Sequence, residues 1–140
     1  MFTVSVLAQY QAAPTNVHMG AAIHVLQYLA GTINKGIELT RKTTCTLLTW
    51  TDSSHNDIQR RMFGTTGFVV TIGKSPITWS SRKQSIRVLS SSATEYIAAD
   101  ATLDDTLWIS SWIRSMNSKL GKEVIRSSPL LLTDSVHVSE

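Results

Sequence analysis

The order of extended and helical segments is the feature that most constrains the fold of this chain. The extended segments are rich in β-branched or aromatic residues and are bounded by Gly or Pro, and a long helical pattern separates the last of them from the others. In chain order the segments are 46–51, 67–73, 77–81 continuing toward 87–89, a helix over 93–120, and an apolar strand over 130–133. Short connectors predict antiparallel neighbours for the first three strands, whereas the helical crossover lets the last strand lie parallel to an earlier one. We therefore predict an α/β fold with a mixed sheet and the long helix packed on one face.

The long helix carries large apolar residues close to one stripe, and Gly121 is a stop signal at its end. The stripe consists of Ile97, Ala101, Trp108, Trp112 and Met116. Trp108 and Trp112 lie one helical turn apart, so we interpret them as core residues rather than as residues that stack on bases. Trp79, in the third extended segment, is likewise expected in the core.

The N-terminal part of the chain has a different pattern. Pro14, Thr15 and Asn16 form a helix start signal, apolar residues follow at helical spacing, and Gly31 is a stop signal. These features predict an amphipathic helix of about four turns. Because the pattern changes to strands at Cys45, we expect residues 1–44 to form a connecting segment and residues 45–140 to form the main domain.

Composition excludes several classes of protein. A chain of 140 residues with 42% hydrophobic and 16% charged residues has the composition of one globular domain rather than of a disordered protein. A single cysteine, Cys45, excludes an internal disulfide and a cysteine-rich zinc site. No apolar run approaches the about 20 residues of a membrane span, so we expect a soluble, intracellular protein. The net charge of +3 is compatible with a polyanionic partner without indicating one.

Three acidic residues lie where these elements end or begin. Asp52 and Asp134 follow apolar strands, and Glu95 lies near the start of the long helix. Each has an ordinary structural explanation, as a turn residue, as a helix cap, or as a carboxylate that the helix dipole stabilises. Together they predict a carboxylate cluster, because the expected topology puts Asp52 and Asp134 at the same end of adjacent parallel strands. Mg²⁺ and Mn²⁺ prefer such oxygen ligands, and a metal pair suits in-line hydrolysis of a phosphodiester.

Four segments resemble one known family in order and at its spacing. They read QYLAGT at 27–32, GTTGF at 64–68, SPITWSSRKQS at 75–85 and LSSSATEYIAA at 89–99. The chain resembles the ribonuclease H domain of the Pol polyprotein of copia-type LTR retrotransposons over nearly its whole length. The resemblance implies a ribonuclease H-like fold. It also implies cleavage of the RNA strand of RNA/DNA hybrids during reverse transcription.

The resemblance also implies roles for individual residues. It makes Asp52, Glu95 and Asp134 catalytic residues and metal ligands, with Mg²⁺ as the cofactor and Mn²⁺ as a substitute. Arg82, Lys83 and Gln84 would belong to the surface that faces the nucleic acid, although a solvated hairpin turn explains Arg82 and Lys83 as well. The implied partners are an RNA/DNA hybrid and the reverse transcriptase part of the same polyprotein. A membrane partner is not expected, and the oligomeric state is left open.

The chain departs from the family pattern in two segments near the acids. The family's Asp-Ala-Asp-Trp corresponds here to DSSH at 52–55, and its Thr-Glu-Ala-Glu corresponds to SATE at 92–95. The sequence also ends at Glu140, before the helix, strand and fourth acidic ligand that follow in the family, so we expect a C-terminally truncated domain. Besides an active nuclease, two alternatives therefore stay open. One is an inactive Pol-derived fragment with weak, salt-sensitive binding to nucleic acid. The other is a structural role in which an exposed sheet edge associates with another Pol segment or a second copy.

Overall fold

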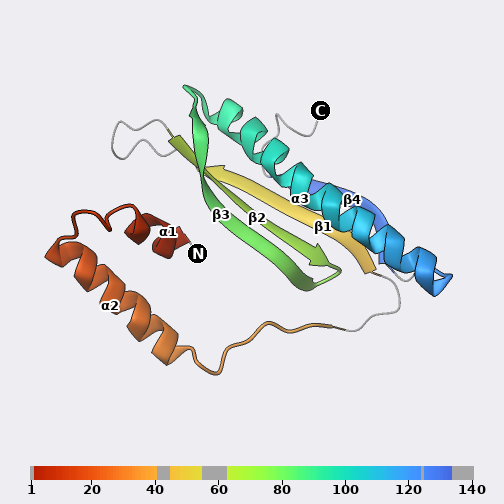
Figure 1. The fold of residues 1–140 in the computed structure, drawn as a ribbon, viewed down its shortest axis with the longest axis horizontal. Coiled ribbons are helices and arrows are strands. Elements are labelled where there is room, and N and C mark those ends of the chain that lie inside the picture. Colours follow the sequence, from red (N-terminus) through yellow and green to blue (C-terminus); the bar gives the residue numbers. More distant parts are fainter. Residues whose placement is uncertain (1, 41–44, 55–62, 124, 134–140) are drawn as a thin grey trace. The chain divides into compact units, whose positions relative to one another are not determined.

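The computed structural model describes residues 2–40, 45–54, 63–123 and 125–133, with the side chains of Cys45 and Ser127 excepted. Its contacts divide the chain into two compact units, Met1–Ile37 and Glu38–Glu140 (Figure 1). The boundary that the sequence predicts, between residues 44 and 45, adjoins residues outside the described ones and stays a prediction. Within the described residues, no helix combines the length and the apolar character that a membrane crossing requires.

The N-terminal unit consists of two helices. Helix α2 (Asn16–Gly31) confirms the predicted helix and ends at the predicted glycine, whereas α1 (Phe2–Ala8) was not predicted. Thr15 caps α2, and its backbone N–H donates to Nδ1 of His18 at 3.0 Å. The His18 ring also stacks on Tyr10, with 4.0 Å between the ring centroids. At the other end Thr32 caps α2, and its hydroxyl donates to the carbonyl of Tyr28 at 2.8 Å; the helix has no buried residue.

The second unit is a four-stranded mixed sheet with one long helix. Its elements in chain order are β1 (Cys45–Ser54), β2 (Phe63–Ile72), β3 (Ser75–Arg87), α3 (Ser91–Leu120) and β4 (Ile125–Thr133). The strands lie in the order β3-β2-β1-β4, with β1, β2 and β3 antiparallel and β4 parallel to β1. Figure 1 shows α3 running along the sheet. This confirms the predicted α/β, ribonuclease H-like architecture.

Glycines and polar caps define the ends of these elements. Gly73, with φ of +61°, lies in the tight turn that joins β2 to β3. The Ser90 hydroxyl accepts from the N–H of Ala93 at the start of α3, and Gly121 ends that helix in the left-handed conformation. After the helix, the Asn117 side chain donates to the carbonyl of Ile125 at 2.7 Å. This bond joins the end of α3 to the first residue of β4.

The face of α3 that packs on the sheet differs from the predicted stripe. Trp108 is 71% exposed and Trp112 is 54% exposed, so the prediction that they are core residues is wrong. Trp79 is 44% exposed, and its predicted core position is wrong as well. The buried residues of α3 are Thr94, Ala98, Ala99, Thr102, Thr106, Ile109, Ser110 and Ile113. The helix is thus rotated so that small and hydroxyl-bearing side chains face the sheet.

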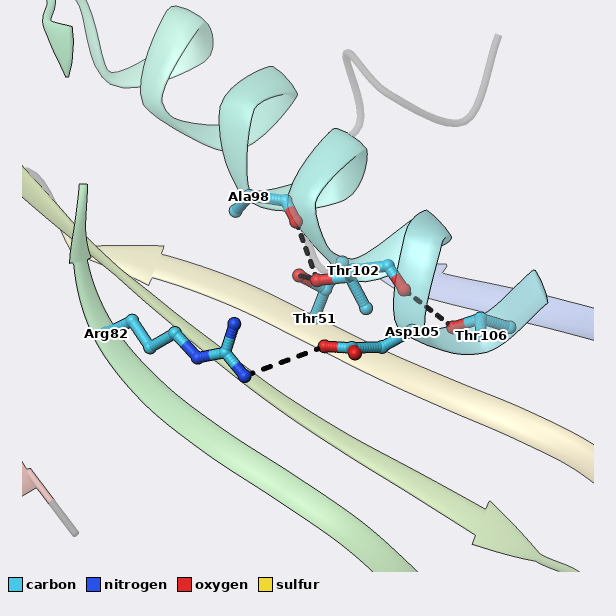
Figure 2. A network of polar contacts seen from close by, with 6 residues as sticks. All are labelled: Thr51, Arg82, Ala98, Thr102, Asp105 and Thr106. Atoms are coloured by element: carbon cyan, nitrogen blue, oxygen red, sulfur yellow. Dashed lines mark hydrogen bonds and ion pairs between the residues drawn. The ribbon is translucent and has the colours of Figure 1, made fainter. Parts of the chain in front are cut away.

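Threonine hydroxyls can be buried on α3 because the helix backbone accepts their protons. Thr102 donates to the carbonyl of Ala98 at 2.6 Å, and Thr106 donates to the carbonyl of Thr102 at 2.8 Å (Figure 2). A buried hydroxyl without a partner costs about 1–3 kcal/mol, and these bonds remove that cost. Among the described residues, the hydrophobic cluster beside these threonines contains the buried residues Leu47, Phe68, Val70, Ile109 and Ile113, with the partly buried Ile72 and Ile125 packed against it.

Hydroxyl pairs also join α3 to the central strand β1. Thr49 pairs with Thr106 at 3.0 Å, and Thr51 pairs with Thr102 at 3.1 Å, measured between the Oγ1 atoms. Two residues of a strand rise about 6.6 Å and four residues of a helix rise about 6 Å, so the two spacings match. The pairs therefore fix the position of α3 along β1.

Candidate active site

Glu95 is the fifth residue of α3 and is half-buried against β1. Its Oε1 atom accepts a hydrogen bond from the Ser53 hydroxyl at 2.6 Å. Its Oε2 atom is buried and has no hydrogen-bond partner among the described residues. A buried carboxylate oxygen without a partner is costly, and such atoms call for a ligand that supplies positive charge or a proton.

Asp52 lies on β1 beside Ser53 and is exposed. Thr51 and Ser53 both bond to residues of α3, so strand alternation directs the Asp52 side chain toward the other face of the sheet. Asp52 is paired with Gly67 across the β1–β2 ladder. The contact to Glu95 therefore comes from Ser53, which is a residue that sequence reasoning missed.

Asp134 falls outside the described residues. The parallel register pairs Thr51 with Thr133, the residues that precede Asp52 and Asp134 in the sequence. Within the part of the chain that is described, no group of three His, Cys, Asp or Glu side chains could hold a metal. The predicted cluster of three carboxylates thus stays a prediction, with Asp52 and Glu95 placed on neighbouring elements.

Gln84 fastens the start of α3 to the sheet. Its side chain is 7% exposed, and its Nε2 atom donates to Oγ1 of Thr66 at 3.0 Å and to the carbonyl of Thr94 at 2.9 Å. These bonds join β3, β2 and the residue of α3 that precedes Glu95. A β-carbon at Gly64 would meet Cγ2 of Thr94 and would lie 2.6 Å from Oε1 of Gln84, so the backbone of β2 passes close to this contact. The predicted contact of Gln84 with nucleic acid stays a prediction, and the structure shows a residue engaged inside the fold.

Two similar proteins of known name are retrotransposon Pol polyproteins. A Pol polyprotein of the transposon RE1 from Arabidopsis thaliana is 33% identical over 135 residues, which is 96% of this chain and 9% of that polyprotein. The Pol polyprotein of transposon RE2 from the same plant is 35% identical over 119 residues, or 85% of this chain and 8% of the polyprotein. The chain is related to retrotransposon Pol polyproteins. No family model and no solved structure matches it.

The Pol-related chain also resembles a protein of comparable length. The secreted RxLR effector protein 161 of Plasmopara viticola is 31% identical over 117 residues, which cover 83% of this chain and 80% of that protein. The two Arabidopsis polyproteins are much longer, and the chain spans less than a tenth of either one. The relationship to Pol therefore concerns one segment of those polyproteins.

Basic side chains of the Pol-related chain are displayed near the end of β3. The Arg82 guanidinium lies 3.9 Å from the carboxylate of Asp105, and these side chains are 71% and 41% exposed (Figure 2). Lys83 and Arg87 both approach the Phe63 ring, at 5.2 Å and 4.9 Å from its centroid. Such exposed contacts are weak, and the cationic groups remain close to solvent. The surface can therefore offer positive charge to a phosphate backbone.

Proposed function

We propose that this chain is a ribonuclease H-like domain of a retrotransposon Pol and hydrolyses the RNA strand of RNA/DNA hybrids during reverse transcription. Three observations support the proposal together: the fold, the relationship to Pol, and the buried Glu95 oxygen without a partner. The last observation carries the most weight, because a carboxylate that serves only the fold is expected to have both oxygens satisfied.

The donor set suits a hard divalent cation. Asp52, Glu95 and Asp134 are the proposed ligands of Mg²⁺, with Mn²⁺ as a substitute, since both ions prefer carboxylate oxygens. Glu95 lies at the α3 face of β1, whereas strand alternation directs Asp52 to the other face, so a shared ion requires Asp52 to change its orientation. Such an ion, when bound, would supply Lewis-acid stabilisation of the charge that develops on the oxygens of the cleaved phosphodiester. Oε2 of Glu95 suits this role, because it is a buried carboxylate oxygen without a donor in the described part of the chain.

The basic end of β3 supplies the contact to the substrate. In this proposal Arg82 and Lys83 bind backbone phosphates and position the hybrid without reading its sequence. Replacing both by Ala should weaken hybrid binding and lower its dependence on salt, because binding then neutralises fewer phosphates and releases fewer counterions. The reverse transcriptase part of the same polyprotein is the proposed protein partner.

Cleavage of an end-labelled RNA/DNA hybrid tests the proposal. The folded chain should cut the RNA strand with Mg²⁺ or Mn²⁺ and should stop on addition of EDTA. Asp52→Asn should abolish cutting without unfolding the chain, because Asp52 is exposed. Asp104→Asn is a matched control, since it removes the same charge from an exposed position on α3. Cutting that persists in Asp52→Asn, or a folded chain that does not cut, would contradict the proposal.

One observation favours a second candidate. The described contact of Glu95 is with Ser53, and strand alternation separates Asp52 from it. This arrangement would suit an inactive Pol-derived fragment that keeps the fold and binds nucleic acid weakly. A folded chain whose hybrid binding is salt-sensitive and unaccompanied by turnover would support this candidate.

A further inference from the structure

The bond between Ser53 and Glu95 is short and joins a neutral donor to a carboxylate. Its length of 2.6 Å lies in the range of charge-assisted O–H···O⁻ bonds, which are about twice as strong as neutral ones. Both side chains are half-buried, so water competes less for the bond than it would at the surface.

Ser53 completes a series of hydroxyls on β1. Thr49, Thr51 and Ser53 occupy alternate positions of the strand, and each bonds to a residue of α3. The first two contact threonines four residues apart on the helix, whereas Ser53 reaches the longer side chain of Glu95. The threonine pairs fix the position of the helix along the strand. The position of the Glu95 carboxylate then depends on the torsion angles of its side chain, and the Ser53 bond restricts these angles.

We propose that Ser53 is a positioning residue for Glu95. Its hydroxyl holds Oε1 and leaves Oε2 as the free oxygen for a divalent cation. The inference rests on the proposed function, because it assigns Ser53 a role in presenting a metal ligand. It goes beyond that function in naming a neutral residue on which the geometry of the ligand depends.

Affinity for Mn²⁺, measured by the electron paramagnetic resonance of the free ion, tests the role without any turnover. Ser53→Ala should weaken binding by about tenfold, the lower end of the effect typical of residues that orient a ligand. Ser53→Thr keeps the hydroxyl on a strand-compatible residue and should restore most of the affinity. Ser54→Ala is the matched control at an exposed neighbouring position and should bind like the wild type. Wild-type affinity in Ser53→Ala would overturn the inference.

A double-mutant cycle tests the contact itself in the absence of metal. Urea unfolding of Ser53→Ala, Glu95→Ala and the double variant should be non-additive if the bond exists in solution. Additive changes would overturn the inference and leave the proposed function standing. A wild type that binds no Mn²⁺ and cuts no hybrid would refute the proposed function, and the assigned role of Ser53 would be refuted with it.

Discussion

Gly64→Ala on β2 adds only one methyl group and should still lower the stability of the fold strongly. In Gly64→Ala, the new β-carbon would meet Cγ2 of Thr94 and would lie 2.6 Å from Oε1 of Gln84. Neither neighbour is free to yield. Thr94 is fully buried on α3, and Gln84 is held by two hydrogen bonds from its Nε2 atom.

The magnitude follows from these two contacts. Forcing an additional methyl group into a packed interior costs about 1–3 kcal/mol. If Gln84 moves aside instead, each of its two hydrogen bonds is lost at about 1 kcal/mol. We therefore expect Gly64→Ala to lower the free energy of unfolding by about 2 kcal/mol if only Gln84 moves, and by about 3–5 kcal/mol when both effects contribute.

Urea unfolding followed by tryptophan fluorescence measures this change. Gly67→Ala is the control on the same strand, because its β-carbon would lie 3.9 Å from the Asp52 carbonyl in ordinary contact. That control should stay within about 1 kcal/mol of the wild type. Adding Gln84→Ala to Gly64→Ala should cost less than the sum of the two single changes, since it removes one of the clashing groups. A Gly64→Ala variant as stable as Gly67→Ala would refute the reasoning.

Three further expectations concern α3 and its end, each measured by the urea midpoint. Thr102→Val leaves the buried Thr51 hydroxyl without its partner and should lower the free energy of unfolding by about 1–3 kcal/mol. Adding Thr51→Val removes that hydroxyl and should recover much of the lost stability. A double variant less stable than Thr102→Val would contradict this expectation. Trp108→Ala should lower the free energy of unfolding by less than about 1 kcal/mol, because the Trp108 side chain is exposed. Ile113→Ala should lower it by about 2–5 kcal/mol, because Ile113 is fully buried. The reverse order would show that Trp108 is buried in solution. Gly121→Ala should cost about 1–2 kcal/mol, since φ is +63° there, and an unchanged midpoint would argue against the left-handed cap.

The topology could be predicted because its signals are local and strong. Gly31 and Gly121 end helices at or next to the predicted residues, and the β-branched runs became β1, β2 and β3. The strand β4 pairs with β1 in parallel as the long crossover requires. Helix α1 gave no comparable signal, because its short sequence has neither a cap nor a stop residue.

The face of α3 could not be predicted by hydrophobicity. Thr102 and Thr106 count as polar in any hydrophobic pattern, yet their hydroxyls bond to the helix backbone and to β1. Trp108 and Trp112 count as core residues in the same pattern, yet they are exposed. A hydrophobicity pattern ranks side chains by their free energy of transfer out of water. It therefore takes no account of a hydroxyl whose hydrogen-bond partner lies inside the fold.

The candidate site was predicted in part. The sequence placed Glu95 near β1, and the structure agrees, but it gave no reason to connect that carboxylate to Ser53. The alternation of hydroxyl residues at 49, 51 and 53 is a signal that could have indicated the contact, because alternate residues share one face of a strand. Gln84 was predicted to face the nucleic acid together with Arg82 and Lys83, and its amide is engaged with Thr66 and Thr94 inside the fold.

The threonine-rich packing between α3 and β1 has a consequence for how stability varies with temperature. Exposing apolar surface raises the heat capacity on unfolding, whereas exposing polar surface lowers it. Thr49, Thr51, Thr102 and Thr106 occupy positions where aliphatic side chains would ordinarily lie. The heat capacity change of unfolding should therefore fall below the usual about 12–15 cal/mol/K per residue, and a smaller value flattens the curve of stability against temperature. A domain built in this way loses less of its stability on cooling than one of equal size with an aliphatic interface.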